Sequence, residues 1–442
     1  MTGAQDRDYC FDIAIFGQVS KDVLHASCGT IHRLGGVTYP ACVAARLGLT
    51  TWTLSYASRE LVDQATTRFL EAGISPLWVV YEGDSITYDI HYADEIVEQQ
   101  AVRGGPLSLP NIVLPDNLSS FSAKACLVYP VSHSGAVEFM REFGKHCGIM
   151  SIDLQHDIIR PEDLEQFRPY IDLVFTNRSS LMALYDDLPL LEAIKELQKS
   201  YPNTYIVVKM GLSGSLAVDR TGEIWQVPAY TASFAFTVGA GDAFDIAVLT
   251  QLIRGSELRH AVDHGSRLAA RFVESTSERP EDSISNYNTD ARKAVGVSIS
   301  KPTPLIYVAG HFHSEPIRMY MEHVGDALEN VGFETFLPHR DAGIVGLNDV
   351  TPAHAFRADI CALRDAVGII AVLDGAYRGG TYFELGFAYC NGKPAFILCT
   401  DNTLGVSNMI SQSSRVVTSD LITIVNEILE HCGNVGELWP AQ

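Results

Sequence analysis

A single glutamate in the last third of the chain has the type and setting of a nucleophile. Glu384 follows an apolar run at residues 367–372, which is typical of a buried parallel strand, and a glycine-rich stretch at residues 373–381. We expect this stretch to deliver Glu384 into the first turn of an apolar helix. The positive end of the helix dipole would keep the carboxylate ionised there, and an ionised carboxylate can attack an electrophilic carbon.

Three further polar residues in this third could complete a site around Glu384. Tyr307 lies in an expected strand, Asp359 in an expected helix and Asn408 in a short polar segment. Each has an ordinary explanation on its own, because Tyr favours strands, an Asp on a helix is usually solvated and Asn favours turns. Even a Glu at a helix start is often only a capping or dipole partner. Only the sequence around these residues can distinguish a catalytic role from an ordinary structural one.

A second candidate site lies in the first two thirds of the chain. In the segment Thr-Val-Gly-Ala-Gly-Asp-Ala-Phe, the small residues Gly239, Ala240 and Gly241 open an apolar helical segment. Small residues at a helix start let backbone N–H groups approach an anion, and the helix dipole favours negative charge there. Asp242, beside such an anion hole, could take the proton from a hydroxyl that attacks a phosphoryl group. Other turns that follow or precede expected elements carry Asp22, Gly35, Gly36, Gly211 and Gly214.

Composition limits the classes of function. The chain has 442 residues, 47% hydrophobic and 19% charged, which predicts a well-buried globular protein of two domains. Its net charge of -21 repels phosphate backbones and acidic lipids, so we expect no nucleic-acid and no membrane partner. An anionic substrate would have to be held by local donors such as helix N-termini and single Arg or Lys side chains.

The cysteines predict neither disulfides nor a metal site. There are nine, an odd number, without C-x-x-C pairs or ligand-like His spacing, and several lie in apolar runs. Residues 1–9 are polar and no stretch reaches eighteen apolar residues. We expect reduced thiols, no bound metal, and a soluble, cytoplasmic protein.

Strand-like runs alternate with helical segments throughout, which predicts α/β architecture with parallel sheets. A polar, proline-containing stretch interrupts this alternation of strand-like and helical segments. We therefore predict a domain at residues 1–278, a linker at 279–303 and a smaller domain at 304–442. The clearest strands and the last helix are expected at residues 11–16, 149–152, 173–175, 205–209, 305–309, 367–373 and 422–431.

The order of the motifs over roughly residues 11–275 resembles the ribokinase-like (PfkB) family of carbohydrate and nucleoside kinases. The resemblance implies a ribokinase-like α/β domain in which Asp242 is the catalytic base and the amides of residues 239–241 form the anion hole. It places Asp22 and the Gly35-Gly36 turn at the sugar hydroxyls, and Gly211 and Gly214 at ATP.

Three positions depart from that family. Phe236 stands where the family has an Asp, and the Asn-x-x-Glu motif that organises magnesium and phosphates becomes Asn177-Arg178-Ser179-Ser180. The Asn that often follows the Gly-Gly turn is missing, with Pro40 nearby. Asn177 is kept as a candidate phosphate-binding residue. The domain is therefore either a kinase that uses ATP and Mg²⁺ or a degenerate, ligand-binding relative of one.

The last third resembles the nucleoside 2-deoxyribosyltransferase family, through Tyr307-Val308-Ala309-Gly310, the glycine-rich run to Glu384 and Gly392-Lys393-Pro394. This implies a flavodoxin-like doubly wound parallel sheet. It implies that Glu384 is the nucleophile, Tyr307 aims it and Asp359 handles the proton of the nucleobase. Asn408 would complete the site of a neighbouring subunit, hence a homo-oligomer, dimer or higher. The substrate-binding set is then Gly310, Asp374, Arg378, Gly380 and Asn408.

Arg378 is the informative departure in this run. Six residues before the nucleophile, the transferases usually carry an Asp for the 5′-hydroxyl, and related nucleoside monophosphate glycosidases carry a Ser near the phosphate. An Arg suits a 5′-phosphate through bidentate, charge-assisted hydrogen bonds. Pairing of Arg378 with a surface acid has about equal weight.

The leading hypothesis is an N-glycosidase, without a cofactor, that acts on a nucleoside or nucleoside 5′-monophosphate and is fused to a kinase-like domain. One alternative is a base-exchanging 2-deoxyribosyltransferase with an active sugar or nucleoside kinase, which would make the protein bifunctional. Another is a nucleotide-sensing regulatory protein with a degenerate kinase domain.

Overall fold

The computed structural model describes most of the chain. The described residues are 9–26, 29–93, 96–104, 114, 118–130, 133–154, 161–185, 188, 190–211, 214–230, 232, 236–285, 287, 294–295, 304–330, 333–346, 350–375, 379–400, 405–419 and 421–432.

Strands and helices alternate along the described chain. The strands are β1 (Tyr9–Ala26), β2 (Gly29–Gly36), β3 (Thr51–Ser58), β4 (Ser75–Tyr81), β5 (Thr87–Ala93), β6 (Ile96–Arg103), β7 (Phe121–Val128), β8 (Cys147–Leu154), β9 (Leu173–Asn177), β10 (Tyr205–Lys209), β11 (Ser215–Val218), β12 (Ile224–Val227), β13 (Ala229–Tyr230), β14 (Ala294–Val295), β15 (Leu305–Gly310), β16 (Glu334–Phe336), β17 (Gly368–Leu373), β18 (Ala395–Cys399) and β19 (Val416–Thr418). The helices are α1 (Thr38–Arg46), α2 (Arg59–Glu71), α3 (His133–Phe143), α4 (Pro161–Glu165), α5 (Arg178–Leu184), α6 (Leu190–Ser200), α7 (Ala240–Ile253), α8 (Leu258–Phe272), α9 (Glu315–Asn330), α10 (Pro352–Asp365), α11 (Gly379–Cys390), α12 (Asn408–Ser413) and α13 (Leu421–Cys432), with short helical turns that include η4 (Pro280–Ile284) and η5 (Pro338–Ala342).

The chain divides into two compact units. The first contains almost all of the chain up to Ala294, and the main part of the second runs from Val295 onward. In the first unit η4 packs against α8 and α1, and Arg68 forms a salt bridge with the buried Glu281. η4 overlaps the start of the linker predicted at residues 279–303. The predicted domain and linker limits stay predictions.

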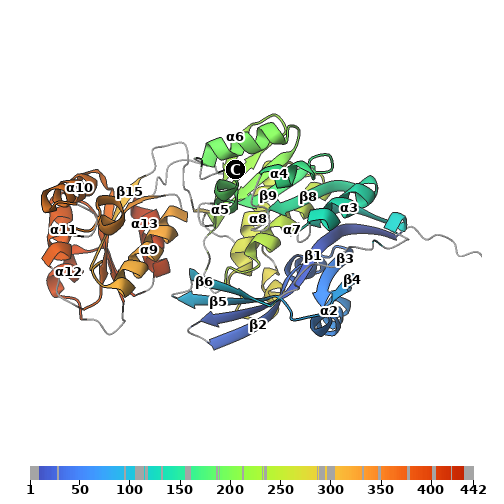
Figure 1. Cartoon of the computed structure of the whole chain (residues 1–442), viewed down its shortest axis with the longest axis horizontal. Helices are drawn as coiled ribbons and strands as arrows, with labels where there is room; N and C mark the ends of the chain where they lie inside the picture. The colour runs from blue at the N-terminus through green and yellow to red at the C-terminus, as the bar shows by residue number, and fades with distance from the viewer. Residues whose placement is uncertain are drawn as a thin grey trace, which may run out of the picture. The chain divides into compact units, whose positions relative to one another are not determined.

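The first unit is built on a long, mostly parallel sheet with the order β12-β11-β10-β9-β8-β7-β1-β3-β4 (Figure 1). β1 lies inside this sheet and pairs in parallel with β3 and β7. Its second half leaves the sheet and pairs with β2 and β5, and β5 pairs with β6. We call this second group, the end of β1 with β2, β5 and β6, the lid sheet. The main sheet and the lid sheet meet where β1 passes from one to the other.

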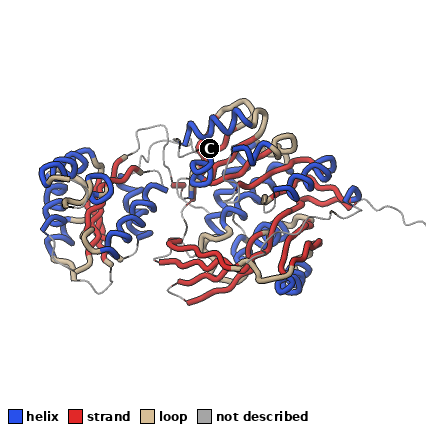
Figure 2. Tube along the Cα trace, in the orientation of Figure 1, coloured by secondary structure: helices blue, strands red, loops and turns tan. Residues whose placement is uncertain are grey.

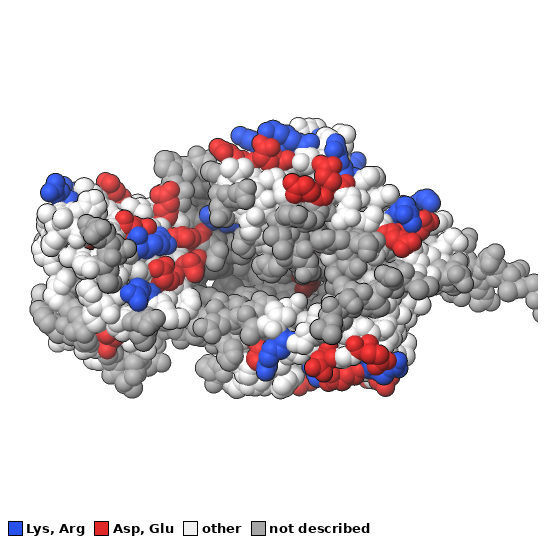
Figure 3. Space-filling model, viewed as in Figure 1, with Lys and Arg blue, Asp and Glu red and all other residues white. Residues whose placement is uncertain are grey.

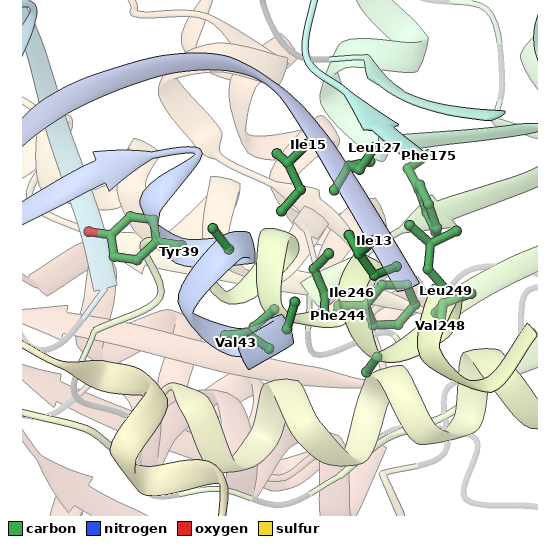
Figure 4. Close-up of a cluster of buried hydrophobic side chains, with 14 of the residues drawn as sticks. Ile13, Ile15, Tyr39, Val43, Leu127, Phe175, Phe244, Ile246, Val248 and Leu249 are labelled. Atoms are coloured by element: carbon green, nitrogen blue, oxygen red, sulfur yellow. The ribbon is translucent and has the colours of Figure 1, made fainter. Parts of the chain in front are cut away.

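Both faces of the main sheet are covered by apolar side chains. Helices α1, α2, α7 and α8 contribute to one buried cluster together with Ile13, Ile15 and Leu127 of the sheet (Figure 4). On α3, Phe139 stacks on Phe16 of β1, with ring centroids 4.8 Å apart. Burial on both faces explains why these strands are continuous apolar runs rather than alternating patterns.

The second unit is a five-stranded parallel sheet in the order β16-β15-β17-β18-β19. Figure 2 shows its strands between helices on both sides. Helices α9 and α13 pack on one face against residues such as Val308 and Ile370, and α10 and α11 pack on the other against Tyr307 and Ala371. This is the doubly wound arrangement that the family resemblance implies, and its central strand β15 carries Tyr307 of the predicted site.

The sequence-based strands and the last helix are confirmed. The expected strand at residues 205–209 coincides with β10, and the expected helix at 422–431 lies within α13. The expected first strand at 11–16 is only part of β1, because the pattern does not show that the same strand continues into the lid sheet.

The turn between β10 and β11 gives a stability prediction. Gly214 has φ +79, and a Cβ there would lie 2.1 Å from the carbonyl oxygen of Val227. Gly211 has φ +56, but its Cβ would meet nothing within 4 Å. Gly211→Ala therefore costs about 1 kcal/mol of unfolding free energy, and Gly214→Ala more than about 2 kcal/mol. Denaturant unfolding of the full chain measures both, and equal effects would contradict the steric role of Gly214.

Candidate functional site

The fold brings three predicted residues of the second unit together. Tyr307 lies on β15, Asp359 on α10 and Glu384 on α11. β15 and β17 pair in parallel, with Tyr307 opposite Ile369. Because α10 and α11 cover the same face of the sheet, a side chain of β15 on that face meets both helices.

Tyr307 is fixed in place and donates to Glu384. Its hydroxyl lies 2.8 Å from Glu384 Oε1. Its ring is fully buried and stacks on Phe336 of β16, with centroids 5.5 Å apart. A ring held on its faces cannot swing, so the hydroxyl keeps one oxygen of the carboxylate in a constant direction.

Burial sets the protonation of the two carboxyl groups. It raises the pKa of Glu384 to about 7, although the hydrogen bond from Tyr307 acts to lower this pKa and the charge of Asp359 adds to the rise. Burial also raises the pKa of Asp359 to about 6. Asp359 Oδ1 is buried and has no hydrogen-bond partner among the described residues. Both groups can therefore exchange protons near neutral pH, as acid–base catalysis requires.

The expected first-turn position of Glu384 is wrong. Helix α11 begins at Gly379, and its first turn contains no acidic residue. Glu384 lies in the second turn, where the helix dipole has little effect, and desolvation raises its pKa instead of lowering it. The carboxylate is held by Tyr307, not by the end of the helix.

The other predicted substrate residues are spread around this pair. Asp374 follows β17, and its Oδ2 lies 3.7 Å from Nδ1 of His311. Gly380 is open, with nothing within 4 Å of its Cβ position, whereas a Cβ on Gly310 would lie 2.6 Å from Met321 Sδ. Gly310 therefore already has a packing role. Asn408 begins α12 and is exposed.

Arg378, the predicted phosphate ligand, lies outside the described residues.

The first unit presents a second site at the N-terminus of α7. Gly239 has φ +85 and precedes Ala240 and Gly241, so the predicted anion hole lies at a helix start. Asp242 is in the first turn, and its Oδ1 accepts a hydrogen bond of 2.6 Å from the hydroxyl of Tyr129. Burial raises the pKa of Asp242 to about 7, so this group is also poised to exchange a proton.

A half-buried lysine, Lys209, supports this helix start. Lys209, at the end of β10, lies 2.9 Å from Asp245 Oδ2 and 3.1 Å from Asp153 Oδ2. A Cβ on Gly241 would lie 3.3 Å from its Nζ. Lys209 thus joins β8 and β10 to α7 directly below the predicted anion hole. No motif in the sequence marks this contact.

Asp22 lies in the lid sheet, on the part of β1 that pairs with β2 and β5, and is 3% exposed. Its Oδ2 accepts a hydrogen bond of 2.6 Å from Tyr39, and its Oδ1 one of 3.1 Å from Ser20. Burial raises the pKa of Asp22 to about 6. A Cβ on Gly35 would lie 2.3 Å from Asp22 Oδ1, and one on Gly36 2.0 Å from the carbonyl oxygen of Gln18. Both glycines are therefore needed for this close approach.

The residues that replace the metal-handling positions do not fit a divalent cation. Asn177 Oδ1 accepts a hydrogen bond of 2.7 Å from the backbone of Ser180 and so caps α5. Ser180 offers a neutral hydroxyl, and Phe236 is buried in an apolar cluster. Magnesium prefers carboxylate and phosphate oxygens. No step of the chemistry below runs through magnesium.

In the described ranges no group of three or more His, Cys, Asp or Glu side chains is placed to hold a metal ion. No helix in the described part of the chain is long and apolar enough to cross a membrane. Figure 3 shows basic groups beside acidic ones on the visible face of the described residues.

The chain matches two family models. A model described as pfkB family carbohydrate kinase covers residues 119–283, and one described as Nucleoside 2-deoxyribosyltransferase covers residues 306–417. The chain joins a kinase-type domain to a transferase-type domain. The fusion predicted from the motifs is confirmed. We use these two names for the domains from here on.

The curated relatives are named as sugar kinases. The chain is similar to 5-dehydro-2-deoxygluconokinase of Clostridium perfringens, 23% identical over 156 residues that cover 33% of this chain and 46% of the relative. It is also similar to the protein of the same name from Listeria monocytogenes, 28% identical over 117 residues that cover 25% and 36%. The chain spans less than half the length of these relatives.

Solved structures show the fold of the kinase-type domain. A ribokinase from Thermotoga maritima is 17% identical, with 63% of this chain and 100% of that chain covered and a TM-score of 0.53. The adenosine kinase from Sinorhizobium meliloti is 18% identical, with 63% and 98% covered and a TM-score of 0.53. The predicted ribokinase-like α/β fold is confirmed.

Proposed function

We propose that the transferase-type domain cleaves the N-glycosidic bond of a nucleoside or nucleoside 5′-monophosphate, with Glu384 as the nucleophile. The observation that carries the proposal is the 2.8 Å hydrogen bond from Tyr307 to Glu384. Among the described residues, Tyr307 alone donates to this carboxylate. The second oxygen is thus left for attack on carbon.

The chemistry takes two steps. Glu384 attacks the anomeric carbon, the bond from this carbon to the base nitrogen breaks, and a glycosyl ester forms. Asp359 in its protonated form gives a proton to the departing base, which leaves neutral. A water molecule then attacks the anomeric carbon, the ester bond breaks and the carboxylate of Glu384 is restored. The proton of that water returns to Asp359, so the cycle closes without a cofactor.

The raised pKa values of Asp359 and Glu384 suit their proposed roles as proton donor and nucleophile. Asp359, with a pKa near 6, holds a proton in part of the molecules at neutral pH. Glu384 must be ionised to attack, and its pKa near 7 leaves it about half ionised there. The two groups interact, so the pH dependence reports the pair as a unit.

A 5′-phosphate is the favoured substrate feature because of Arg378. The protein carries a net charge of -21, which repels a free nucleotide at long range. A monophosphate would therefore need a local cation, and Arg378 lies six residues before the nucleophile. Its guanidinium can bind a phosphate with two hydrogen bonds.

Base exchange is the second candidate function. The family model that matches residues 306–417 is described as Nucleoside 2-deoxyribosyltransferase, which favours it. The first step is the same, but a second nucleobase instead of water attacks the anomeric carbon. Transfer needs a site that binds the incoming base and excludes water. Products therefore separate the two functions directly.

The proposal also covers the activity of the kinase-type domain and the oligomeric state of the protein. The relatives of this domain are named as sugar kinases, so an active domain would transfer a phosphoryl group from ATP to a sugar or nucleoside. The alternative is a domain that binds a nucleotide and regulates its neighbour. Asn408 is exposed, as a residue that completes the site of a neighbouring subunit would be, and we propose a homo-oligomer in the cytoplasm.

Removal of the nucleophile tests the main proposal. Glu384→Gln should lower cleavage at least about 10³-fold, because the amide cannot form the ester. Glu334→Gln, at an exposed position on β16, is the matched control and should retain full activity. Chromatography of a panel of nucleosides and monophosphates measures both, with and without a second free base. Unchanged cleavage by Glu384→Gln would rule out the mechanism, and a new nucleoside would establish exchange.

Removal of the tyrosine hydroxyl should shift the pH dependence. The hydrogen bond lowers the pKa of Glu384, so Tyr307→Phe raises this pKa further. Attack needs the ionised form, and the acid limb of kcat/KM should therefore move to higher pH. Asp359→Asn removes a charge that raises the same pKa and should move this limb to lower pH. Profiles from pH 5 to 9 measure both shifts, and opposite signs would contradict the assignment.

Arg378→Ala tests whether Arg378 binds the 5′-phosphate of the substrate. The variant should lose the preference for a 5′-monophosphate over its nucleoside by about 10- to 100-fold, mainly through KM. Arg364→Ala, exposed at the end of α10, is the control and should keep the preference. Competition kinetics with both substrates in one reaction give the ratio. A preference that survives Arg378→Ala removes this residue from the site but leaves the role of Glu384 intact.

A further inference from the structure

In the kinase-type domain, the aromatic residue Tyr39 lies where the sugar that accepts the phosphoryl group is predicted to bind. Asp22, the residue predicted to bind sugar hydroxyls, already has a hydroxyl donor on each oxygen. One donor is Ser20, its neighbour in β1. The other is Tyr39 of α1, whose hydroxyl lies 2.6 Å away. A carboxylate has about four acceptor positions, so two donors do not saturate Asp22, but the phenol of Tyr39 occupies a position beside Oδ2 from which a polyol hydroxyl would donate.

The ring of Tyr39 lies against the start of the anion hole. A Cβ built on Gly239 would be 2.8 Å from Cγ of Tyr39 and within 3.0 Å of both Cδ atoms. The opposite end of the side chain is its hydroxyl on Asp22. Figure 4 shows Tyr39 on α1 with this hydroxyl pointing away from the aliphatic side chains of the cluster. One side chain therefore spans from the predicted sugar carboxylate to the predicted anion hole.

Tyr39 is not a mobile surface group. It is 3% exposed, and its ring packs edge-on against Phe272 with centroids 6.1 Å apart. The charges of Asp22 and Asp242 both act to raise the pKa of its hydroxyl, which is well above its ordinary value because of burial. The phenol therefore stays protonated and remains a donor to Asp22.

Side-chain contacts hold the lid sheet, which contains Asp22, in position. Arg33 of β2 is 3% exposed and donates to the carbonyl oxygens of Ser275 and Ser277 at 2.8 and 2.9 Å. Its guanidinium lies 5.2 Å from the ring centroid of Phe236. Phe236 in turn packs with Leu24 and Ile90 of the lid sheet. The position at which the family has a carboxylate thus helps to hold the lid sheet down.

We propose that Tyr39 takes the place of the acceptor in the kinase-type domain and determines its specificity by excluding sugars and other polyols. The phenol supplies the hydroxyl that a polyol would give to Asp22, and the ring fills the space between Asp22 and the anion hole. This inference concerns the first unit and does not depend on the chemistry proposed for Glu384.

The alternative to exclusion is displacement of Tyr39 by the acceptor. A polyol would have to break the 2.6 Å hydrogen bond, move the ring off Gly239 and open a well-packed cluster. It would regain one hydrogen bond at Asp22, and the phenol would lose its buried partner. Burial of a polar group without a partner is costly, so displacement is unfavourable.

The experiment is a titration of the full chain with D-ribose by isothermal calorimetry. The wild-type protein should show no saturable binding. Tyr39→Ser shortens the side chain and removes the ring, and should show saturable binding of D-ribose at least about tenfold tighter than the weakest affinity that the titration can detect. Tyr39→Phe keeps the ring without the hydroxyl, so it frees Asp22 but leaves the space filled, and should bind as weakly as wild type.

Each result decides the proposal. Saturable binding by the wild type, absence of binding by a folded Tyr39→Ser protein, or equal binding by the Phe and Ser variants would overturn it. Circular dichroism checks the fold of each variant. Where Tyr39→Ser does not fold, Tyr39→Ala replaces it, because Ala also removes the ring and the hydroxyl and is the best helix former for a position in α1. Gain of binding in the variant without the ring, and in no other, supports it.

Discussion

A carboxylate removed from water keeps its charge only when a donor replaces the lost solvent, and this constraint shapes both domains. Three acids, of which Asp22 is buried and the other two are half-buried, each receive a tyrosine hydroxyl: Glu384 from Tyr307 at 2.8 Å, Asp242 from Tyr129 at 2.6 Å and Asp22 from Tyr39 at 2.6 Å. In each case burial raises the pKa of the acid to between about 6 and 7. A phenol suits this role because it donates one hydrogen bond and brings a large apolar body that fits a core.

The sheets decide where these pairs form. Tyr307 lies on a central strand of its sheet, and Tyr129 follows β7. Helices that follow or cover the strands bring the acids to the tyrosines, α11 for Glu384 and α7 for Asp242. The edge formed by the ends of parallel strands is where side chains from several elements converge without blocking the strand pairing.

The sequence reveals the acids much better than their partners. The glycine-rich runs before Asp242 and Glu384 are local signals, and the structure puts both acids on the helices that those runs open. Tyr129 is 113 positions from Asp242 and Tyr307 is 77 from Glu384. The family resemblance predicts the role of Tyr307. The sequence does not predict the roles of Tyr129 and Lys209, because no local pattern encodes a contact that only the sheet order creates.

The prediction that Glu384 lies in the first turn of its helix is wrong for the same reason, since the local sequence does not determine the packing. A glycine-rich run predicts that a helix follows, but which glycine opens the helix depends on how the turn packs, and the start at Gly379 moved Glu384 out of reach of the dipole. Burial then reversed the expected direction of its pKa. Local chemistry can be inferred from spacing, whereas desolvation depends on what the rest of the chain places on top of the group.

The number of donors distinguishes the three pairs in function. Among the described residues, Tyr307 alone donates to Glu384 and Tyr129 alone to Asp242, so each acid keeps an oxygen for chemistry. Asp22 receives two hydroxyls, one on each oxygen. Asp22 is also only 3% exposed and lies against Tyr39, which limits the approach of a ligand to its remaining lone pairs. We therefore propose that the same tyrosine–carboxylate pair aims a reactive group in the transferase-type domain and closes a ligand site in the kinase-type domain.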